Sequence, residues 1–162
     1  MPELVAAYVA LGSNLADPRA QVERGFEALA KLPRTILHSR SRLYRTPPWG
    51  MVDQPDFVNA VARLGTRLSP RELLDALLAI ENRAGRRRGI ANGPRTLDLD
   101  LLLHGDAAID QPGLAVPHPR LQHRAFVLLP LAELAPDLDV PGQGRVAGLL
   151  ARVDAQGCVR LD

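Results

Sequence analysis

The chain has 162 residues, 46% of them hydrophobic and 23% charged, which fits one soluble globular domain spanning residues 1–162. No apolar run reaches the roughly 18 to 20 residues of a membrane-spanning helix and no signal-peptide pattern opens the chain, so we expect a cytoplasmic protein without a membrane partner. The single cysteine, Cys158, excludes an intramolecular disulfide, and the net charge of +2 does not by itself indicate nucleic-acid binding.

The first third of the chain is expected to form a strand, a helix and an extended segment. Residues 5–11 are apolar and rich in strand formers. Asp17 and Pro18 are typical of an N-cap and a first helical residue, and the helix is expected to end at Pro33. Residues 36–44 then predict an extended segment.

Residues 57–68 predict a strand whose side chains alternate between two faces. One face carries Val58, Ala60, Ala62 and Leu64, and the other carries Asn59, Val61 and Arg63. The sequence Ser-Pro-Arg-Glu at 69–72 is a capping box with proline at the first helical position, and Gly85 is the expected stop of that helix. The buried stripe of the helix is expected to be Leu73, Leu74, Leu77, Leu78 and Ile80.

The second half of the chain predicts further strands and shorter helices. Residues 96–103 are the most apolar strand candidate, and Gly105-Asp106 predicts a turn into a partner strand. Residues 124–134 predict a helix in pieces, interrupted by Pro130, and residues 141–162 predict a short helix and a terminal strand. This mixture indicates an α+β sandwich, with helices packed on one face of a mainly antiparallel sheet.

The pair Asp98 and Asp100 is the first candidate site. On a strand, residues i and i+2 point to the same face roughly 6.5 to 7 Å apart, so the two carboxylates project together while Leu97, Leu99 and Leu101 turn into the core. Two such carboxylates repel each other unless a cation lies between them, and their oxygens suit Mg²⁺. The alternative is a solvated polar face of an edge strand, which an isolated Asp-x-Asp would favour.

Five arginines and no acidic residue lie between Asn82 and Thr96, directly before the aspartates: Arg83, Arg86, Arg87, Arg88 and Arg95. Arg86, Arg88 and Arg95 are candidates for phosphate binding, because guanidinium groups bind phosphate oxygens bidentately and stay charged. The surrounding glycines favour a loop that closes over bound phosphates. The alternatives are a solvated surface run and an RNA-binding patch.

A third group of residues offers aromatic rings and an amide. Trp49 lies in a proline-rich loop, Phe57 and Asn59 share one strand face, and Phe126 follows later. A flat heteroaromatic substrate can stack between such rings while an asparagine amide pairs with its polar edge. The alternative for Phe57 and Phe126 is an ordinary core position. His118, between two prolines, either contacts a nucleotide or stiffens a turn by bonding to the backbone.

Taken in order, these segments resemble the 6-hydroxymethyl-7,8-dihydropterin pyrophosphokinases of folate biosynthesis. The resemblance runs from about residue 5 to about residue 140. Its motifs are Leu-Gly-Ser-Asn-Leu at 11–15, Tyr-Arg-Thr-Pro-Pro at 44–48, Gln-Pro-Asp-Phe-Val-Asn at 54–59, Gly-Arg-Arg-Arg at 85–88, Gly-Pro-Arg-Thr-Leu-Asp-Leu-Asp at 93–100 and Val-Pro-His-Pro-Arg at 116–120. The 93–100 motif is highly specific.

The resemblance implies a ferredoxin-like α+β fold and transfer of the β,γ-pyrophosphoryl group of ATP to a pterin alcohol, with release of AMP. It implies that Asp98 and Asp100 bind two Mg²⁺ ions. The residues implied to bind ATP are Glu81, Arg86, Arg88, Arg95, Leu101, His118 and Arg124. Those implied to bind the pterin are Thr46, Pro47, Pro48, Trp49, Phe57, Asn59, Asp98 and Phe126. The residues implied to act in catalysis are Arg86, Arg88, Asp98 and Asp100.

The chain departs from the family pattern in the arginine loop. Family members often carry an arginine followed by Trp or Tyr just before Gly-Pro-Arg, where this chain has Ala91-Asn92, and its loop is one residue shorter than in some relatives. Arg87 or Arg88 is the candidate to compensate. Phe57 replaces a tyrosine seen in some relatives and keeps the stacking surface. The metal and pterin assignments therefore carry over, whereas the details of loop closure do not.

Two other functions use similar features. A non-catalytic RNA-binding module of ferredoxin-like fold also presents an arginine loop, but it needs paired exposed aromatic residues on adjacent strands, which this sequence lacks. A two-metal nuclease needs further acidic ligands, for which Glu81 is the only nearby candidate. We therefore expect an enzyme that binds ATP and a pterin alcohol, acts as a monomer and does not bind nucleic acid.

Overall fold

The computed structural model describes residues 3–15, 17–48, 53–85 and 96–161, and these residues form a central six-stranded sheet. The strand order is β10-β3-β4-β1-β5, and β2 also pairs with β4. The strands are β1 (Val5–Ser13), β2 (Thr35–Arg40), β3 (Tyr44–Thr46), β4 (Phe57–Thr66), β5 (Asp98–His104) and β10 (Val159–Arg160). β4 pairs antiparallel with β1 along its length, while β3 and β2 share its other edge, at residues 57–59 and 62–66 respectively.

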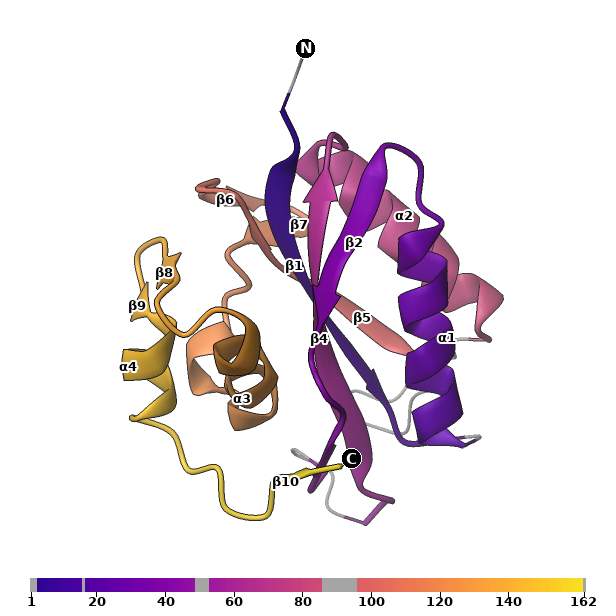
Figure 1. Cartoon of the computed structure of the whole chain (residues 1–162), viewed down its shortest axis with the longest axis vertical. Coiled ribbons are helices and arrows are strands. Elements are labelled where there is room, and N and C mark those ends of the chain that lie inside the picture. The colour runs from indigo at the N-terminus through magenta and orange to yellow at the C-terminus, as the bar shows by residue number, and fades with distance from the viewer. Residues whose placement is uncertain (1–2, 16, 49–52, 86–95, 162) are drawn as a thin grey trace.

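Helices cover both faces of this sheet (Figure 1). α1 (Pro18–Ala30) and α2 (Pro70–Arg83) lie on one face, and α3 (Ala125–Leu134) and α4 (Val146–Leu150) lie on the other. The α+β class is confirmed, but the expectation that helices cover only one face is wrong. Val61 and Leu102 are apolar side chains on the second face, and α3 and α4 bury them in a second core. None of the described helices is long and apolar enough to cross a membrane.

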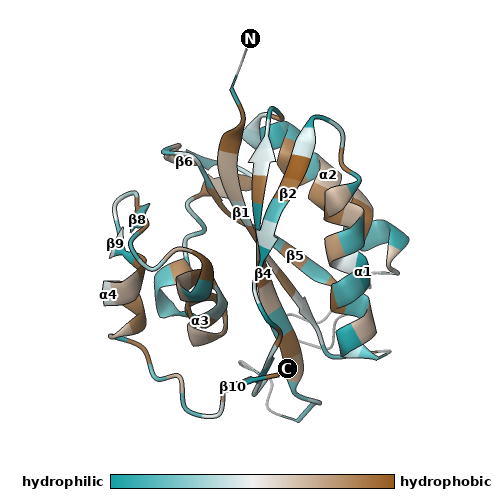
Figure 2. Cartoon of the chain, in the orientation of Figure 1, coloured by the Kyte–Doolittle hydropathy of each residue, from teal (hydrophilic) through white to brown (hydrophobic). Residues whose placement is uncertain are grey.

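The first core lies between the sheet and α1 and α2. Its helix residues include Val22, Phe26, Leu29, Leu73, Leu77 and Ile80. They meet the strand face formed by Val58, Ala60, Ala62 and Leu64, as the alternation predicted, and Figure 2 shows polar residues on the outer side of α1. Leu78 is the exception among the predicted buried leucines, since it turns outward and is 36% exposed.

The predicted starts of α1 and α2 and the predicted stop of α2 are confirmed, but α1 ends at Ala30, with Lys31 as its C-cap, and not at Pro33. Asp17 caps α1 by accepting a hydrogen bond from the Ala20 amide at 3.4 Å, and Ser69 and Glu72 form both halves of the capping box of α2. Gly85 follows α2 with a φ of +82°, a conformation that glycine adopts without steric cost. These local signals therefore set where both helices of the first face begin and where α2 stops.

Three expectations about connections need correction. The extended segment at 36–44 splits into β2 and β3, with a register shift between Leu37 and Ser39. The turn at Gly105 does not pair a new strand with β5, because β6 (Ile109–Gln111) pairs instead with β7 (Leu114–Val116). α3 is one continuous helix with Pro130 inside it, and the burial of Pro130 and its apolar neighbours on the sheet offsets the missing amide donor.

The last part of the chain follows its prediction of a short helix and a terminal strand, which are α4 and β10. A short helical turn, η1 (Leu121–His123), precedes α3, and a small hairpin of β8 (Asp139–Val140) and β9 (Gly144–Arg145) precedes α4. The chain then passes beneath α3 and returns to the sheet as β10 (Figure 1).

Candidate active site

Antiparallel register brings a row of polar residues together across four strands. Gly12 of β1 is the partner of both Asn59 on β4 and Asp98 on β5. Tyr44 of β3 is the partner of Asn59 on its other side. Residues far apart in sequence therefore lie side by side. Asp100 stands two residues along from Asp98, on the same face of β5.

The alternation predicted for β5 is confirmed. Leu97, Leu99 and Leu101 are buried in the first core, whereas Asp98 and Asp100 are only partly buried and face the side of the sheet that carries α3. Within the described ranges, no group of three or more His, Cys, Asp or Glu side chains gathers as a metal site. Two carboxylates without a third protein ligand fit Mg²⁺, which usually takes one or two carboxylates together with substrate phosphates and water.

The lack of a side chain at Gly12 lets the Asn59 amide lie close against β1. A Cβ atom added at Gly12 would lie 2.6 Å from Oδ1 of Asn59, too close for any side chain without a shift. Nδ2 of Asn59 donates a hydrogen bond to Oγ1 of Thr46 at 2.6 Å, and both residues are buried. The amide is therefore held with Nδ2 toward β3 and Oδ1 toward β1.

The start of α3 delivers a cation and a ring to the same face. Arg124 is the N-cap residue of α3, and its Nη1 lies 3.6 Å from Oδ2 of Asp100. The guanidinium carbon of Arg124 is also 5.6 Å from the centre of the Phe126 ring, within the range of a cation–π contact. A positive charge thus stands next to one of the two aspartates, where a phosphate group would also need it.

His118 is held by backbone hydrogen bonds beside the aspartates. Its amide donates to the carbonyl oxygen of Leu102 at 2.9 Å, and its Nδ1 accepts from the Arg120 amide at 3.1 Å. Burial, followed by the charges of Arg124 and Arg120, lowers the pKa of His118 to about 4, although Asp98 acts in the opposite direction. The ring is therefore neutral near pH 7, with its proton on Nε2.

The structure tests one of the two interpretations of His118. The turn-stiffening interpretation is confirmed by the hydrogen bond from the Arg120 amide to the ring. Contact between His118 and a nucleotide stays a prediction.

Glu81 supports β5 between its two aspartates. This residue lies in the last turn of α2, is 1% exposed, and accepts a hydrogen bond from the Leu99 amide on Oε2 at 2.7 Å. β5 ends the described strand order, so the carboxylate takes the place that a further strand would fill. Its predicted contact with ATP stays a prediction. The Leu101 side chain lies in the first core, so a contact of this residue with ATP would use its backbone.

Two residues that the sequence analysis did not single out also support the site. Asn14 is buried at the end of β1, and its Nδ2 donates to Oε1 of Gln54 at 2.8 Å and to the carbonyl of Pro55 at 3.0 Å, which ties down the segment before β4. The Tyr44 hydroxyl donates to Oε1 of Glu133 at 2.8 Å and links β3 to α3. Burial, with help from Glu133, raises the pKa of Tyr44 to about 12. Asn14 belongs to the Leu-Gly-Ser-Asn-Leu motif at the end of the first strand, but Gly-Ser-Asn is too short a signal to assign a role alone, and only the fold reveals the partners of Asn14.

The structure accounts for most, not all, of the predicted site. Phe57 is partly exposed at the start of β4, and Pro47 and Pro48 follow directly after β3. Trp49, Arg86, Arg88 and Arg95 lie outside the described residues. The predicted residues that share the α3 side of the sheet are Asp98, Asp100, Phe57, Asn59 and Thr46, and Arg124 reaches Asp100 from the start of α3.

The chain is similar over most of its length to pyrophosphokinases of known sequence. The sequence model of the family described as 7,8-dihydro-6-hydroxymethylpterin-pyrophosphokinase matches residues 8–136. A 2-amino-4-hydroxy-6-hydroxymethyldihydropteridine pyrophosphokinase of Pseudomonas aeruginosa is 54% identical over 154 residues, covering 95% of each chain. The protein of the same name from Haemophilus influenzae is 42% identical over 159 residues, covering 98% of this chain and 99% of its own.

Solved structures show the same fold at low sequence identity. The structure of an HPPK-DHPS in complex with substrates matches with a TM-score of 0.74 at 11% identity, covering 93% of this chain and 43% of the longer chain. The Plasmodium falciparum HPPK-DHPS A437G with SDX-DHP matches with a TM-score of 0.75 at 15% identity, covering 94% and 46%. With the mixed helices and antiparallel sheet, these matches confirm the ferredoxin-like α+β fold.

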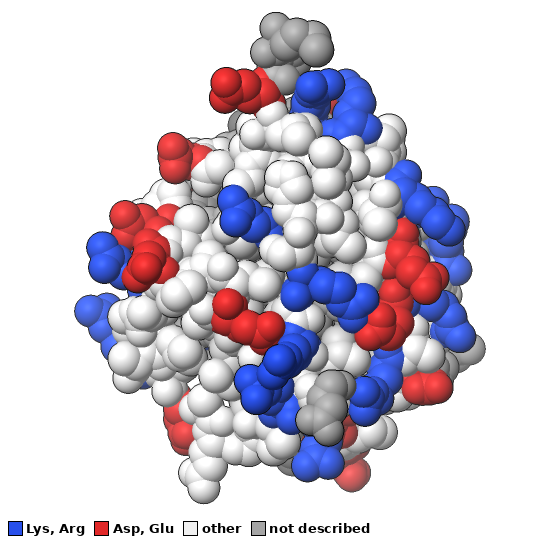
Figure 3. All heavy atoms as spheres, viewed as in Figure 1, with Lys and Arg blue, Asp and Glu red and all other residues white. Residues whose placement is uncertain are grey.

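The RNA-binding alternative gains no support. The relatives named above are pyrophosphokinases, and none is described as an RNA-binding protein. On the face viewed in Figure 3, the described basic and acidic side chains are interspersed and do not form one continuous basic surface.

Proposed function

This chain belongs to the 7,8-dihydro-6-hydroxymethylpterin-pyrophosphokinase family, and we propose that it works with two magnesium ions, held by Asp98 and Asp100. It is an ATP-dependent enzyme that transfers a pyrophosphoryl group from ATP to the hydroxymethyl group of 6-hydroxymethyl-7,8-dihydropterin, in folate biosynthesis. Because both the β- and γ-phosphates move, AMP is the other product. The proposal concerns which residues of this chain carry out the reaction.

The observation that carries the proposal is the row Asn59–Gly12–Asp98 across β4, β1 and β5. The pterin lies beside the Asn59 amide, which occupies the space over Gly12, on the sheet face that also carries Asp98. The Asn59 amide pairs with the polar edge of the ring, since an amide offers both a donor and an acceptor. The hydroxymethyl group then points toward the aspartate side, where ATP binds.

Asp98 and Asp100 supply the charge that the metal ions need. Their carboxylates project from one face of β5 with no third described acidic ligand beside them, a donor set that suits magnesium shared with substrate phosphates. When bound, magnesium neutralises phosphate charge as the pyrophosphoryl group is transferred. The protein's part is to hold the two carboxylates at a fixed spacing on a rigid strand.

Cationic and donor groups complete the ATP half of the site. Arg124, now 3.6 Å from Asp100, is placed to turn to a phosphate oxygen when ATP binds. Arg86, Arg88 and Arg95 bring further charge from the loop before β5. His118, neutral and protonated on Nε2, donates a hydrogen bond without adding a charge that must be desolvated.

The pterin half is completed by rings and loop backbone. Phe57 and Phe126 stack on the two sides of the pterin, since partly exposed rings keep a free face for a ligand. Thr46 orients the Asn59 amide, and we assign Pro47, Pro48 and Trp49 to the edge of the ring. Together these residues select a flat heterocycle that carries hydrogen-bonding groups on its edge.

A coupled assay for AMP release tests the activity of this chain directly. We expect AMP to form from ATP only when Mg²⁺ and the pterin alcohol are both present, because the site orders ATP and its acceptor together. Reactions that lack either the metal ion or the pterin are the controls. If no AMP forms with all components present, the assignment of this activity to the chain is wrong.

We also propose that the enzyme acts as a monomer in the cytoplasm and does not bind nucleic acid. The net charge of +2 gives weak attraction to a polyanion. Sedimentation of the protein with and without ATP tests the monomer, and an RNA filter-binding measurement at low salt tests the absence of nucleic-acid binding.

A further inference from the structure

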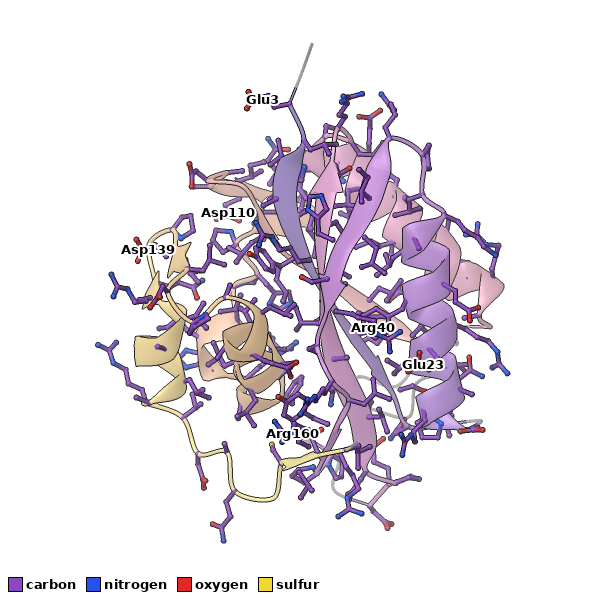
Figure 4. The ribbon with its side chains drawn as sticks, viewed as in Figure 1. Glu3, Glu23, Arg40, Asp110, Asp139 and Arg160 are labelled. Atoms are coloured by element: carbon purple, nitrogen blue, oxygen red, sulfur yellow. The ribbon has the colours of Figure 1, made fainter. Side chains whose placement is uncertain are left out.

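β10 is a short C-terminal strand that lies at one end of the described sheet, beside β3. The match to the family model ends at residue 136, so this strand falls outside it. Figure 4 shows Arg160 on β10 near the lower end of the sheet. Nothing in the roles assigned so far uses this segment.

β10 pairs with the strand that carries Thr46. Val159 is the partner of Arg45, and Arg160 is the partner of Tyr44. One residue further on, the Leu161 amide donates to the carbonyl of Leu43 at 2.7 Å. β3 itself has only three residues, and it pairs with β4 through three residues and with β10 through two, so β10 provides a large share of the pairing that keeps it in the sheet.

Gly157 packs against the loop that follows β3. Its φ is +89°, and a Cβ atom added there would lie 3.5 Å from Cγ and 3.6 Å from Cδ of Pro47. The glycine backbone therefore lies against the proline ring, in a conformation that residues with a side chain rarely adopt. The C-terminal segment thus contacts both β3 and the first residue of the pterin loop.

We propose that the C-terminal strand is a positioning element for the pterin half of the site. It holds β3, and β3 holds Thr46, whose hydroxyl fixes the Asn59 amide at 2.6 Å. It also sets the position of Pro47, where the chain leaves β3. This inference rests on the proposed function, because the role of Asn59 and the loop in pterin binding belongs to that proposal.

The effect should be confined to one substrate. β10 touches β3, whereas Asp98 and Asp100 stand on β5 at the opposite end of the strand order. β4 and β1 lie between them and pair with each other along their whole length. Loosening β3 therefore disturbs the pterin pocket and leaves the metal and ATP half in place.

A truncation that ends the chain at Gln156 tests the proposal. We expect the dissociation constant of the pterin, measured with a non-hydrolysable ATP analogue at saturation, to rise about tenfold or more, because small misplacements of positioning groups have large effects. The dissociation constant of the ATP analogue alone should stay within about twofold of the full-length value. Unchanged pterin binding, or an equal loss for both ligands, overturns the proposal.

A matched pair of glycine variants keeps the test meaningful if the truncated chain does not fold. Gly157→Val and Gly113→Val both place a β-branched residue at a positive φ, +89° and +77°. Near Gly113, in the β6–β7 turn, an added Cβ atom meets only the end of the Arg71 side chain, at 3.8 Å. We expect similar losses of melting temperature but weaker pterin binding only in Gly157→Val.

The two proposals fail in different ways. If the wild-type chain forms no AMP, the proposed function fails before the variants are compared. If the wild-type chain is active and Gly157→Val binds the pterin as tightly as Gly113→Val does, the proposed function stands and the positioning role of the C-terminal strand is wrong.

Discussion

Asp98 and Asp100 stand on β5, at one end of the described strand order, whereas Asn59 stands on β4, with strands on both sides. On β5 the outer edge is held by groups that are not strands: Glu81 accepts from the Leu99 amide, and the His118 amide donates to Leu102. β4 is held by its strand pairing with β1 and β3. The side-chain hydrogen bond from Asn59 to Thr46 only orients the Asn59 amide.

The difference teaches where each half of the site is vulnerable. A strand held by a ladder loses little when one side chain changes, since the backbone pairing remains. A strand edge held by one buried carboxylate depends on that carboxylate, because its loss leaves a buried amide without its acceptor. Single substitutions that disturb β5 should therefore weaken the binding of ATP and metal. Substitutions near β4 should weaken pterin binding only where they displace the Asn59 amide or disturb the pairing of β3.

The largest effect is expected at the aspartates themselves. Asp98→Asn and Asp100→Asn keep the shape of each side chain but remove its charge, so turnover should fall about a thousandfold, the scale of removing one preorganised charged group from an active site. The melting temperature should change little, because both side chains are partly exposed. Steady-state AMP release and a thermal melt measure the two quantities.

Asp110→Asn is the matched control for this prediction. Asp110, labelled in Figure 4, is exposed on β6, which pairs with β7 outside the six-stranded sheet that carries the site residues. Its substitution should leave turnover unchanged. An Asp98→Asn or Asp100→Asn variant with wild-type turnover would remove the metal role from that residue.

The next effect is expected on the pterin half, from Gly12→Ala. The new Cβ would meet Oδ1 of Asn59 at 2.6 Å, so the Asn59 amide must move from its place against β1. The Michaelis constant for the pterin should rise by up to about a hundredfold, while that for ATP changes little. A steady-state analysis with each substrate varied in turn measures the split. Equal changes in both constants would mean that Gly12 serves the stability of β1 and not the position of the Asn59 amide.

Sequence patterns predicted the parts of this site that depend on local order. Alternation alone placed Asp98 and Asp100 on one face and their neighbouring leucines in the core, and the capping box placed the start of α2. Whether those aspartates face a ligand or solvent was not decidable from the alternation. That decision needed the arginine-rich loop and the resemblance to a family.

The parts that could not be predicted depend on register between distant strands. Nothing local in the sequence says that Gly12 pairs with both Asn59 and Asp98, because register is set by whole strands and their cores. The second helical layer was missed for a related reason. The length of α3 depends on burial against the sheet, which overrides the breaking tendency of Pro130.

The smallest effect, and the sharpest test of the comparison, is expected at Glu81. Glu81→Ala removes the acceptor of the Leu99 amide and should lower the free energy of unfolding by about 1–3 kcal/mol, the range for a buried donor left without a partner. Glu81→Gln keeps a carbonyl oxygen at the same place and should retain most of that stability. Urea unfolding of the two variants measures the difference.

The same pair of variants separates support of β5 from contact with ATP. If Glu81 acts through the strand, Mn²⁺ binding in the presence of a non-hydrolysable ATP analogue should weaken about tenfold in Glu81→Ala, the scale seen for residues that orient metal ligands, and less in Glu81→Gln. If Glu81 instead binds the nucleotide through its charge, both variants should weaken analogue binding equally, because both lose the negative charge. Electron paramagnetic resonance of free Mn²⁺ distinguishes these outcomes. The second outcome would place Glu81 among the ATP ligands and would mean that its hydrogen bond with Leu99 does not position the metal ligands.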